Sequence, residues 1–184
     1  MSTENMSLLI GLLLPSAYIA YTDAKSYTIY DKASLPIILA GLVNAIRAGD
    51  LPMALMGWAF GFGLMFALAA AGGAGGGDVK YAAGLGLWLG FPDTVHALLF
   101  AVVIGTAWGT VRLARAGVLR ERLKALAAGV YLRVFCGVKG AVPLQKIPDD
   151  PDAPLPAGVV PFGTCIAATV WAVWLQSLIF KGVV

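Results

Sequence analysis

Two aspartates occupy positions at which their side chains could do acid–base chemistry. Asp23 ends an uncharged run just before Lys25, and Asp78 follows a run of glycines just before Lys80. Two carboxylates about 4 Å apart repel by about 4 kcal/mol at an effective dielectric constant near 20, so they would share one proton. The ionised group could take a proton from water while the protonated group donates to a peptide carbonyl. Such a pair predicts peptide hydrolysis that needs no metal and no cofactor.

The elements that must position this pair are membrane spans. Of the 184 residues, 59% are hydrophobic and only 12% are charged, about half the charged fraction of a soluble domain. An ordinary cytosolic enzyme and a disordered protein are therefore excluded. A span needs roughly 20 apolar residues. Uncharged runs cover Asn5–Thr22, Ala33–Ile46, Leu51–Gly77, Tyr81–Pro92, Thr94–Val111 and Ala153–Phe180.

These runs predict an all-α polytopic membrane protein with about six transmembrane helices. The second and fourth runs are short, and they span only if flanking charged side chains reach the interface or the bilayer thins. We expect one transmembrane domain over residues 1–184, with its only sizeable loop over 112–158. Inside that loop, apolar residues at helical spacing alternate with basic ones, which predicts an amphipathic helix on the inner leaflet. The apolar positions are Leu119, Leu123, Leu126, Val130 and Val134.

The lysines and arginines predict the orientation of the chain. If both termini lie outside, the inward segments are 22–34, 72–80 and 112–158, and every basic residue except Arg47 and Lys181 falls within them. The positive-inside rule favours this arrangement. The net charge of +3 is thereby assigned to a membrane face and not to a nucleic-acid surface. The first helix then ends, and the fourth begins, at the same inner interface, so Asp23 and Asp78 are expected to lie together.

Other kinds of site fit the sequence poorly. It contains no Gly-x-Ser-x-Gly elbow and no His-Glu-x-x-His, and its two cysteines and single histidine form no set of metal ligands. A phosphate loop would need Lys directly after Gly77, and Asp78 and Val79 intervene. Asp149, Asp150 and Asp152 lie in the stretch Pro148–Pro156, which is typical of a solvated linker and matches no calcium loop.

Purely structural roles for the aspartates stay open at this point. Asp78 could simply cap the helix that follows it, while the glycines before it could instead let an extended substrate approach. Asp31 is the main alternative to Asp23 because both belong to the same inner loop. Its place near the start of the second helix favours a capping role.

Three blocks of this sequence resemble the type IV prepilin peptidases, which are membrane aspartyl proteases of the Gly-x-Gly-Asp class. The first block is Asp23-Ala-Lys-Ser-Tyr-Thr-Ile-Tyr-Asp31, followed by Leu35-Pro36. The second is Gly75-Gly-Gly-Asp-Val-Lys80 with the small residues after it. The third is Val160-Pro-Phe-Gly163 at the start of the last helix. The blocks occur in the family's order and on the expected membrane face.

The resemblance implies removal of the basic leader from prepilin-like precursors at the cytoplasmic face of the inner membrane. Asp23 and Asp78 would be catalytic, with no cofactor and no metal. The substrate would carry a hydrophobic helix after its leader, and the oligomeric state is left open. The positions implied to bind substrate or support the site are Gly75, Gly77, Lys80, Pro161, Phe162 and Gly163.

The sequence departs from the family pattern at several points. Tyr30 replaces the usual proline of the first block, and Tyr81 replaces a common leucine. The chain lacks the paired-cysteine cytoplasmic domain of the long members, so we expect no N-methyltransferase activity. Its compact size resembles the branch that serves tight-adherence (Flp) pili, with archaeal preflagellin peptidases as the other compact branch.

Two other functions are compatible with the same aspartates. A small proton-coupled transporter could use them as a relay, although the sequence shows no inverted repeat. An inactive assembly subunit is the other, and the presence of both aspartates counts against it. Whether the two carboxyl groups are in contact at rest, or meet only when their helices move, is not predicted.

Overall fold

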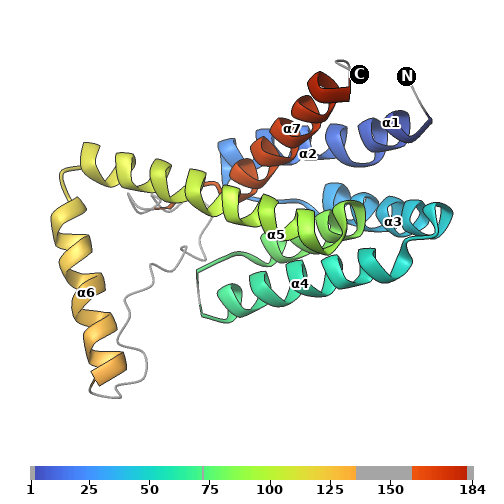
Figure 1. Ribbon diagram of the computed structural model, residues 1–184. Coiled ribbons are helices and arrows are strands. Elements are labelled where there is room, and N and C mark those ends of the chain that lie inside the picture. The colour runs from blue at the N-terminus through green and yellow to red at the C-terminus, as the bar shows by residue number, and fades with distance from the viewer. Residues whose placement is uncertain (1–2, 72, 136–158, 182–184) are drawn as a thin grey trace.

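A computed structural model describes residues 3–71, 73–135 and 159–181 of the chain (Figure 1). Within these ranges all of the regular structure is helical, which confirms the all-α prediction. The elements in order are α1 (Thr3–Leu8), the π-helical turn η1 (Leu9–Leu13), α2 (Leu14–Ser26), α3 (Asp31–Ala48), α4 (Leu51–Ala70), α5 (Gly76–Arg115), α6 (Leu119–Phe135) and α7 (Phe162–Lys181).

Several of these helices are suited to a bilayer. In the described part of the chain, Met6–Ser26, Leu51–Ala70 and Gly76–Arg115 are each long and apolar enough to cross a membrane, and α7 adds a shorter apolar stretch, Phe162–Gln176. Met6–Ser26 joins the second half of α1 to η1 and α2, and α3 covers the second uncharged run. The protein is therefore a polytopic membrane protein, while the number of six spans stays a prediction.

Two helix boundaries differ from the uncharged runs. α4 ends at Ala70, although the run continues to Gly77, because the glycines that follow favour a loop over a helix. α7 begins at Phe162, whereas the predicted run began at Ala153. The predicted linker Pro148–Pro156 lies outside the described residues.

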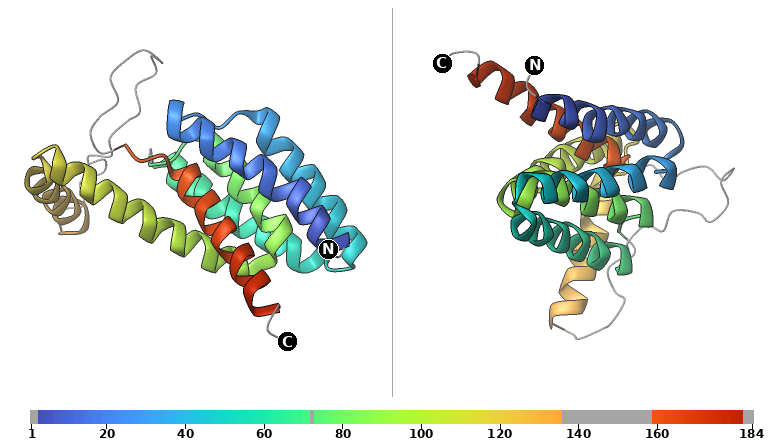
Figure 2. Two further views of the ribbon diagram at one scale, coloured as in Figure 1. Left: turned by 90° about the horizontal axis from the view of Figure 1, so that it is seen from above. Right: turned by 90° about the vertical axis from the view of Figure 1, so that its right-hand side faces the viewer.

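α5 consists of two arms that run in opposite directions. Gly90 has a φ of 72°, which is non-helical and favours glycine, and the chain reverses there (Figures 1 and 2). The arms over 76–89 and 91–115 correspond to the fourth and fifth predicted helices. The hydroxyl of Thr94 donates a hydrogen bond to the Gly90 carbonyl at the break, at 2.5 Å.

α4 packs closely against the first arm of α5. A Cβ atom at Gly57 would collide with the carbonyl of Gly86, and one at Gly61 would lie 2.5 Å from the carbonyl oxygen of Ala82. Small residues allow such close backbone approach between membrane helices. This contact holds the first arm of α5, which carries Asp78, against a neighbouring helix.

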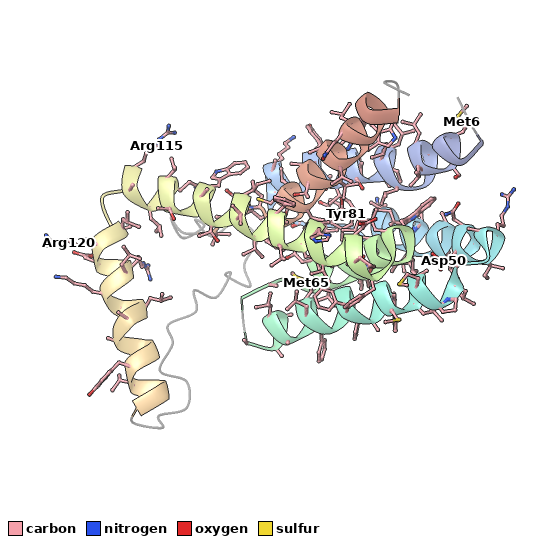
Figure 3. All side chains as sticks on the ribbon, viewed as in Figure 1. Met6, Asp50, Met65, Tyr81, Arg115 and Arg120 are labelled. Atoms are coloured by element: carbon pink, nitrogen blue, oxygen red, sulfur yellow. The ribbon has the colours of Figure 1, made fainter. Side chains whose placement is uncertain are left out.

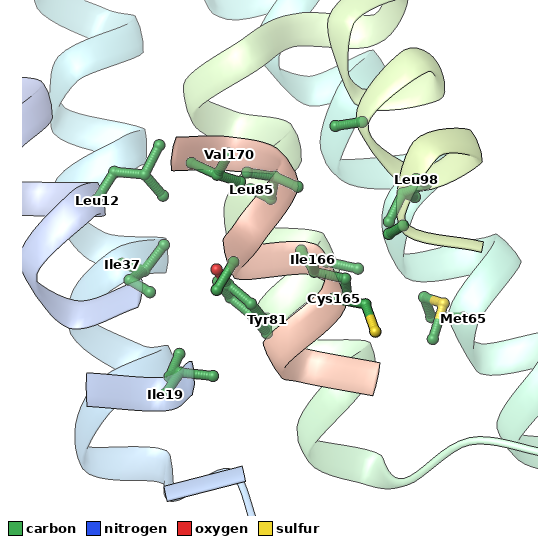
Figure 4. Close-up of a cluster of buried hydrophobic side chains, with 14 of the residues drawn as sticks. Leu12, Ile19, Ile37, Met65, Tyr81, Leu85, Leu98, Cys165, Ile166 and Val170 are labelled. Atoms are coloured by element: carbon green, nitrogen blue, oxygen red, sulfur yellow. The ribbon is translucent and has the colours of Figure 1, made fainter. Parts of the chain in front are cut away.

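The remaining helices complete a core around that arm. Buried side chains from η1, α2, α3, both arms of α5 and α7 meet in it, and Figure 4 shows them close together. Tyr81 is the largest of the fully buried side chains. Members of this core include Leu12, Ile19, Ile37, Tyr81, Leu85, Leu98, Ile166 and Val170.

The two ends of the bundle differ in what they carry. Met6 and Asp50 lie at one end and Arg115 and Arg120 at the other (Figure 3). α1 begins and α7 ends at the first of these ends, while α2 ends and α5 begins at the other (Figure 1). The predicted orientation, with both termini outside and the basic segments inside, stays a prediction.

α6 extends away from the bundle, roughly across the direction of the other helices (Figures 1 and 2). It forms over Leu119–Phe135, where the amphipathic helix is predicted. Leu123 and Leu126 are exposed on it. The helix itself is confirmed, and its position on the inner leaflet stays a prediction.

Candidate active site

Asp23 lies in the last turn of α2, and its carboxylate is held by the first turn of α7. The side chain is buried, with 4% of its surface exposed. Its Oδ2 accepts hydrogen bonds from the backbone N–H of Thr164 at 2.8 Å and from the Thr164 hydroxyl at 3.2 Å. The first N–H groups of a helix have no partner within the helix, and a carboxylate is a favourable acceptor for them. Asp23 is thus fixed by a segment far away in the sequence.

Asp78 lies in the first turn of α5, and its carboxylate is held by its own loop. Its Oδ2 accepts a hydrogen bond from the backbone N–H of Gly75 at 3.0 Å. The expectation of a helix-capping role is therefore partly correct. Asp78 is the third residue of the helix, and its side chain accepts a hydrogen bond from the capping residue, Gly75. The side chain is only half-buried. One carboxylate oxygen makes this bond, and the other accepts none from the described residues.

The two aspartates lie at the same end of the bundle, as predicted, because α2 ends there and α5 begins there. No hydrogen bond joins the two carboxyl groups within the described part of the chain. Ile29, in the turn between α2 and α3, packs toward Gly77, which precedes Asp78, and toward Gly163, which borders the Asp23 carboxylate. A Cβ atom at Gly77 would lie 2.7 Å from the Ile29 Cβ, and one at Gly163 would lie 2.6 Å from the Ile29 Cδ1.

Asp31 makes a different contact from that of the two candidate catalytic aspartates. Its Oδ1 accepts from the Lys80 Nζ at 2.7 Å, in an ion pair whose two side chains are both exposed. Asp31 is the first residue of α3 and not its capping residue, which is Tyr30. Lys80 therefore connects the start of α3 to the first turn of α5, and it compensates the charge of Asp31.

The third sequence block, Val160 to Gly163, leads into the start of α7 at this end of the bundle. A Cβ atom at Gly163 would lie 3.1 Å from the Asp23 Oδ2, so only glycine leaves this carboxylate undisturbed. The Phe162 ring packs toward Gly105 in the second arm of α5, 3.4 Å from where a Cβ atom would be. Gly163 borders the site directly, and Phe162 anchors the beginning of the helix.

Some residues of the site were not predicted. Thr164 follows directly after the third block, so that block gave a signal for its position, though none for its bond to Asp23. Ile29 occurs in the first block but attracted no prediction. Arg112 was counted only as a topology signal, and its contacts with Tyr27 and Val159 depend on tertiary packing that the sequence does not display.

The described residues contain no group of three His, Cys, Asp or Glu side chains that could hold a metal ion. Cys165 is a free, buried thiol in α7, and the single histidine, His96, is exposed on the second arm of α5. The arrangement offers two carboxyl groups, one deeply held and one more open, as the groups able to exchange protons with a water molecule.

Comparison with protein families gives a match to the type IV leader peptidase family over residues 8–110. The match covers more than half of the chain and includes both Asp23 and Asp78, while the block from Val160 to Gly163 lies beyond it. Neither the curated proteins nor the solved structures gave a match to this chain. On the extent of the family match, and with an all-helical membrane fold that brings two aspartates to one end, the chain belongs to the type IV leader peptidase family.

Proposed function

We propose that this protein is an aspartic endopeptidase that removes the basic leader from prepilin-like precursors at the cytoplasmic face of the inner membrane. The observation that supports the proposal is that the end of α2, with Asp23, and the start of α5, with Asp78, lie at one end of the bundle. Family membership supports leader cleavage in general, and the two aspartates supply the chemistry for it.

The reaction needs one proton shared between the two carboxyl groups. The ionised carboxylate takes a proton from a water molecule, whose oxygen attacks the scissile carbonyl carbon. The protonated carboxyl group donates its proton to the carbonyl oxygen, which gives a tetrahedral intermediate. The C–N bond then breaks as the proton taken from water passes to the leaving amine. One hydroxyl of the intermediate returns its proton to the carboxylate that had donated it, which leaves a carboxylic acid and restores the singly protonated pair. Atoms and charges balance without a metal or a cofactor.

The surroundings of the pair suit a peptide that arrives from the membrane interface. Asp78 is half-buried, so a substrate backbone can reach it from the open side. The ion pair between Lys80 and Asp31 compensates one positive charge beside the site, which reduces repulsion of a basic leader. The exposed apolar helices that border the site match a substrate whose leader precedes a hydrophobic helix.

The test is cleavage of a prepilin precursor by the purified protein in lipid, followed by gel shift and mass. Asp23→Asn and Asp78→Asn are each expected to lower the rate by about 10²–10⁴-fold, the usual contribution of a general acid or base. Asp31→Asn, which alters the neighbouring surface ion pair, is the matched control and should cleave at nearly the wild-type rate. The mature product should carry no added methyl group.

Two results would contradict the proposal. If Asp31→Asn is inactive and Asp23→Asn is active, the pair is misassigned. If the wild type cleaves none of several prepilins but carries protons across a lipid vesicle, and either aspartate variant abolishes that flux, the protein is a transporter.

A further inference from the structure

We propose that Arg112 is a positioning residue for the Asp23 carboxylate and acts from the end of α5 on two segments that flank it. The inference rests on the proposed peptidase function for its kinetic test but not for its structural one. Among the cations at this end of the bundle, Arg112 is notable because its guanidinium contacts two other parts of the chain and does not simply extend into solvent.

The contacts of Arg112 reach segments far away in the sequence. Its Nη1 donates one hydrogen bond to the Tyr27 hydroxyl and another to the carbonyl oxygen of Val159, the latter at 2.8 Å. The guanidinium also lies 5.9 Å from the centre of the Tyr27 ring, within the range of a cation–π interaction. A planar group with several fixed donors can satisfy both acceptors at once, whereas a lysine ammonium is a point charge that cannot reproduce this geometry.

Tyr27 controls the backbone on one side of Asp23. It ends α2 in a left-handed conformation, with a φ of 51°, and it is the only non-glycine residue with a positive φ in the described chain. Its backbone N–H donates to the carbonyl of Asp23 itself at 2.8 Å. A left-handed residue with a side chain is sterically disfavoured, so outside contacts must help to keep it there. The hydrogen bond and the ring contact from Arg112 are such contacts.

Val159 belongs to the segment that leads into α7, the second helix that flanks Asp23. It stands just before Pro161 and the first turn of α7, and that turn carries Thr164, whose N–H and hydroxyl both bind the Asp23 carboxylate. Arg112 therefore contacts both the end of the helix that carries Asp23 and the segment that leads to Thr164, the hydrogen-bond donor of Asp23. Loss of the guanidinium should let these two segments separate while the helices remain.

Arg115 provides a matched control for this role. It is one turn farther along α5, at the same end of the bundle, and it is exposed. Within the described part of the chain, its guanidinium makes no hydrogen bond or ion pair. If arginines at this end served only to orient the chain in the membrane, Arg112 and Arg115 would be equivalent.

The kinetic test compares Arg112→Ala, Arg112→Lys, Tyr27→Phe and Arg115→Ala in the lipid cleavage assay, with a peptide that spans a basic leader and the following hydrophobic helix. We expect Arg112→Ala to lower kcat by about 10²-fold, the scale of a 1 Å misplacement, with KM changed less than about twofold. Arg112→Lys should recover only part of this loss. Tyr27→Phe should lower kcat less, and combining it with Arg112→Ala should add nothing further.

The structural test is hydrogen–deuterium exchange of the protein in lipid, which does not depend on activity. Arg112→Ala should speed exchange at the amides of Tyr27 and Thr164, and Arg115→Ala should leave both unchanged. If Arg112→Ala behaves like Arg115→Ala in exchange and in kcat, the proposal is wrong. If Arg112→Ala does not fold, Tyr27→Phe decides, since unchanged kcat and exchange in that variant would equally overturn it. Failure of the wild type to cleave would refute the peptidase function alone, because the exchange result would still stand.

Discussion

Asp23 and Asp78 are held in contrasting ways although they lie at the same end of the bundle. The Asp23 carboxylate is buried and bound by Thr164, which is 141 residues away in the sequence. Asp78 is half-buried and bound by Gly75, three residues away. One aspartate is positioned by tertiary packing and the other by its own turn of helix.

This difference indicates where the site can be perturbed. A change in α7 or in the turn after α2 should act on Asp23, whereas a change in the glycine loop should act on Asp78. Ile29 is the exception, because it packs toward the glycine beside each aspartate. It therefore connects the two surroundings and should transmit a disturbance from one to the other.

Among the glycines that border the site, the largest effect is expected at Gly77. A Cβ atom there would lie 2.7 Å from the Ile29 Cβ and 3.1 Å from its carbonyl oxygen, so the backbone of the turn would have to move. Gly77→Ala should lower the cleavage rate by about 10²-fold, since a shift of about 1 Å can cost that much. Gly76→Ala is the control, because nothing lies within 4 Å of a Cβ atom at that position. Equal activity of the two variants would show that the contact with Ile29 does not matter.

A smaller effect with a specific rescue is expected at Gly163. A Cβ atom there would lie 2.6 Å from the Ile29 Cδ1 and 3.1 Å from the Asp23 Oδ2. Because the first of these atoms is the flexible end of a side chain, Gly163→Ala should cost about tenfold in rate, near 1.4 kcal/mol of transition-state stabilisation. Ile29→Val removes the Cδ1 atom and should restore part of the activity in the double variant. Absence of any rescue would place the damage at Asp23 alone.

The same contrast explains what the sequence could predict. The two aspartates, the helices and their common end of the bundle follow from uncharged runs and from the distribution of lysine and arginine, which act over local stretches. The break in α5 at Gly90 lies close to the gap between the fourth and fifth uncharged runs, which Asp93 separates. The bond from Gly75 to Asp78 is local too, and the expected capping role came near to it.

The surroundings of Asp23 could not be predicted in the same way. Thr164, Ile29 and Arg112 act through contacts between segments that only the packed bundle brings together, and no spacing in the chain signals them. Asp31 shows the same limit, because its position suggested a helix cap and the structure pairs it with Lys80 instead. Residue type and spacing identified the groups able to do chemistry, and tertiary packing decides which of them is held in place.

Removing the hydroxyl of Thr164 should weaken the hydrogen bonding of Asp23 without changing the surroundings of Asp78. Thr164→Val keeps the shape of the side chain and the backbone N–H but removes the hydroxyl that donates to Asp23 at 3.2 Å and lies 3.1 Å from the Ala20 carbonyl. One such hydrogen bond contributes about 1 kcal/mol, so we expect a loss of activity of about fivefold. Thr164→Ser retains the hydroxyl and should recover most of the wild-type rate. If the serine variant is as slow as the valine variant, packing of the methyl group and not the hydrogen bond is the cause.

The smallest effect is expected for the ion pair between Lys80 and Asp31, which lies on the Asp78 side of the site. Both side chains are exposed, and an exposed pair contributes only about 0–1 kcal/mol because solvent screens it. Lys80→Ala should therefore change the thermal midpoint in detergent little and should leave cleavage within about twofold of wild type. Added salt should make the difference smaller still, because it screens surface charges. A loss of activity in Lys80→Ala as large as that in Gly77→Ala would mean that Lys80 contacts the substrate directly. The residues around Asp78 would then bind substrate as well as position this carboxylate.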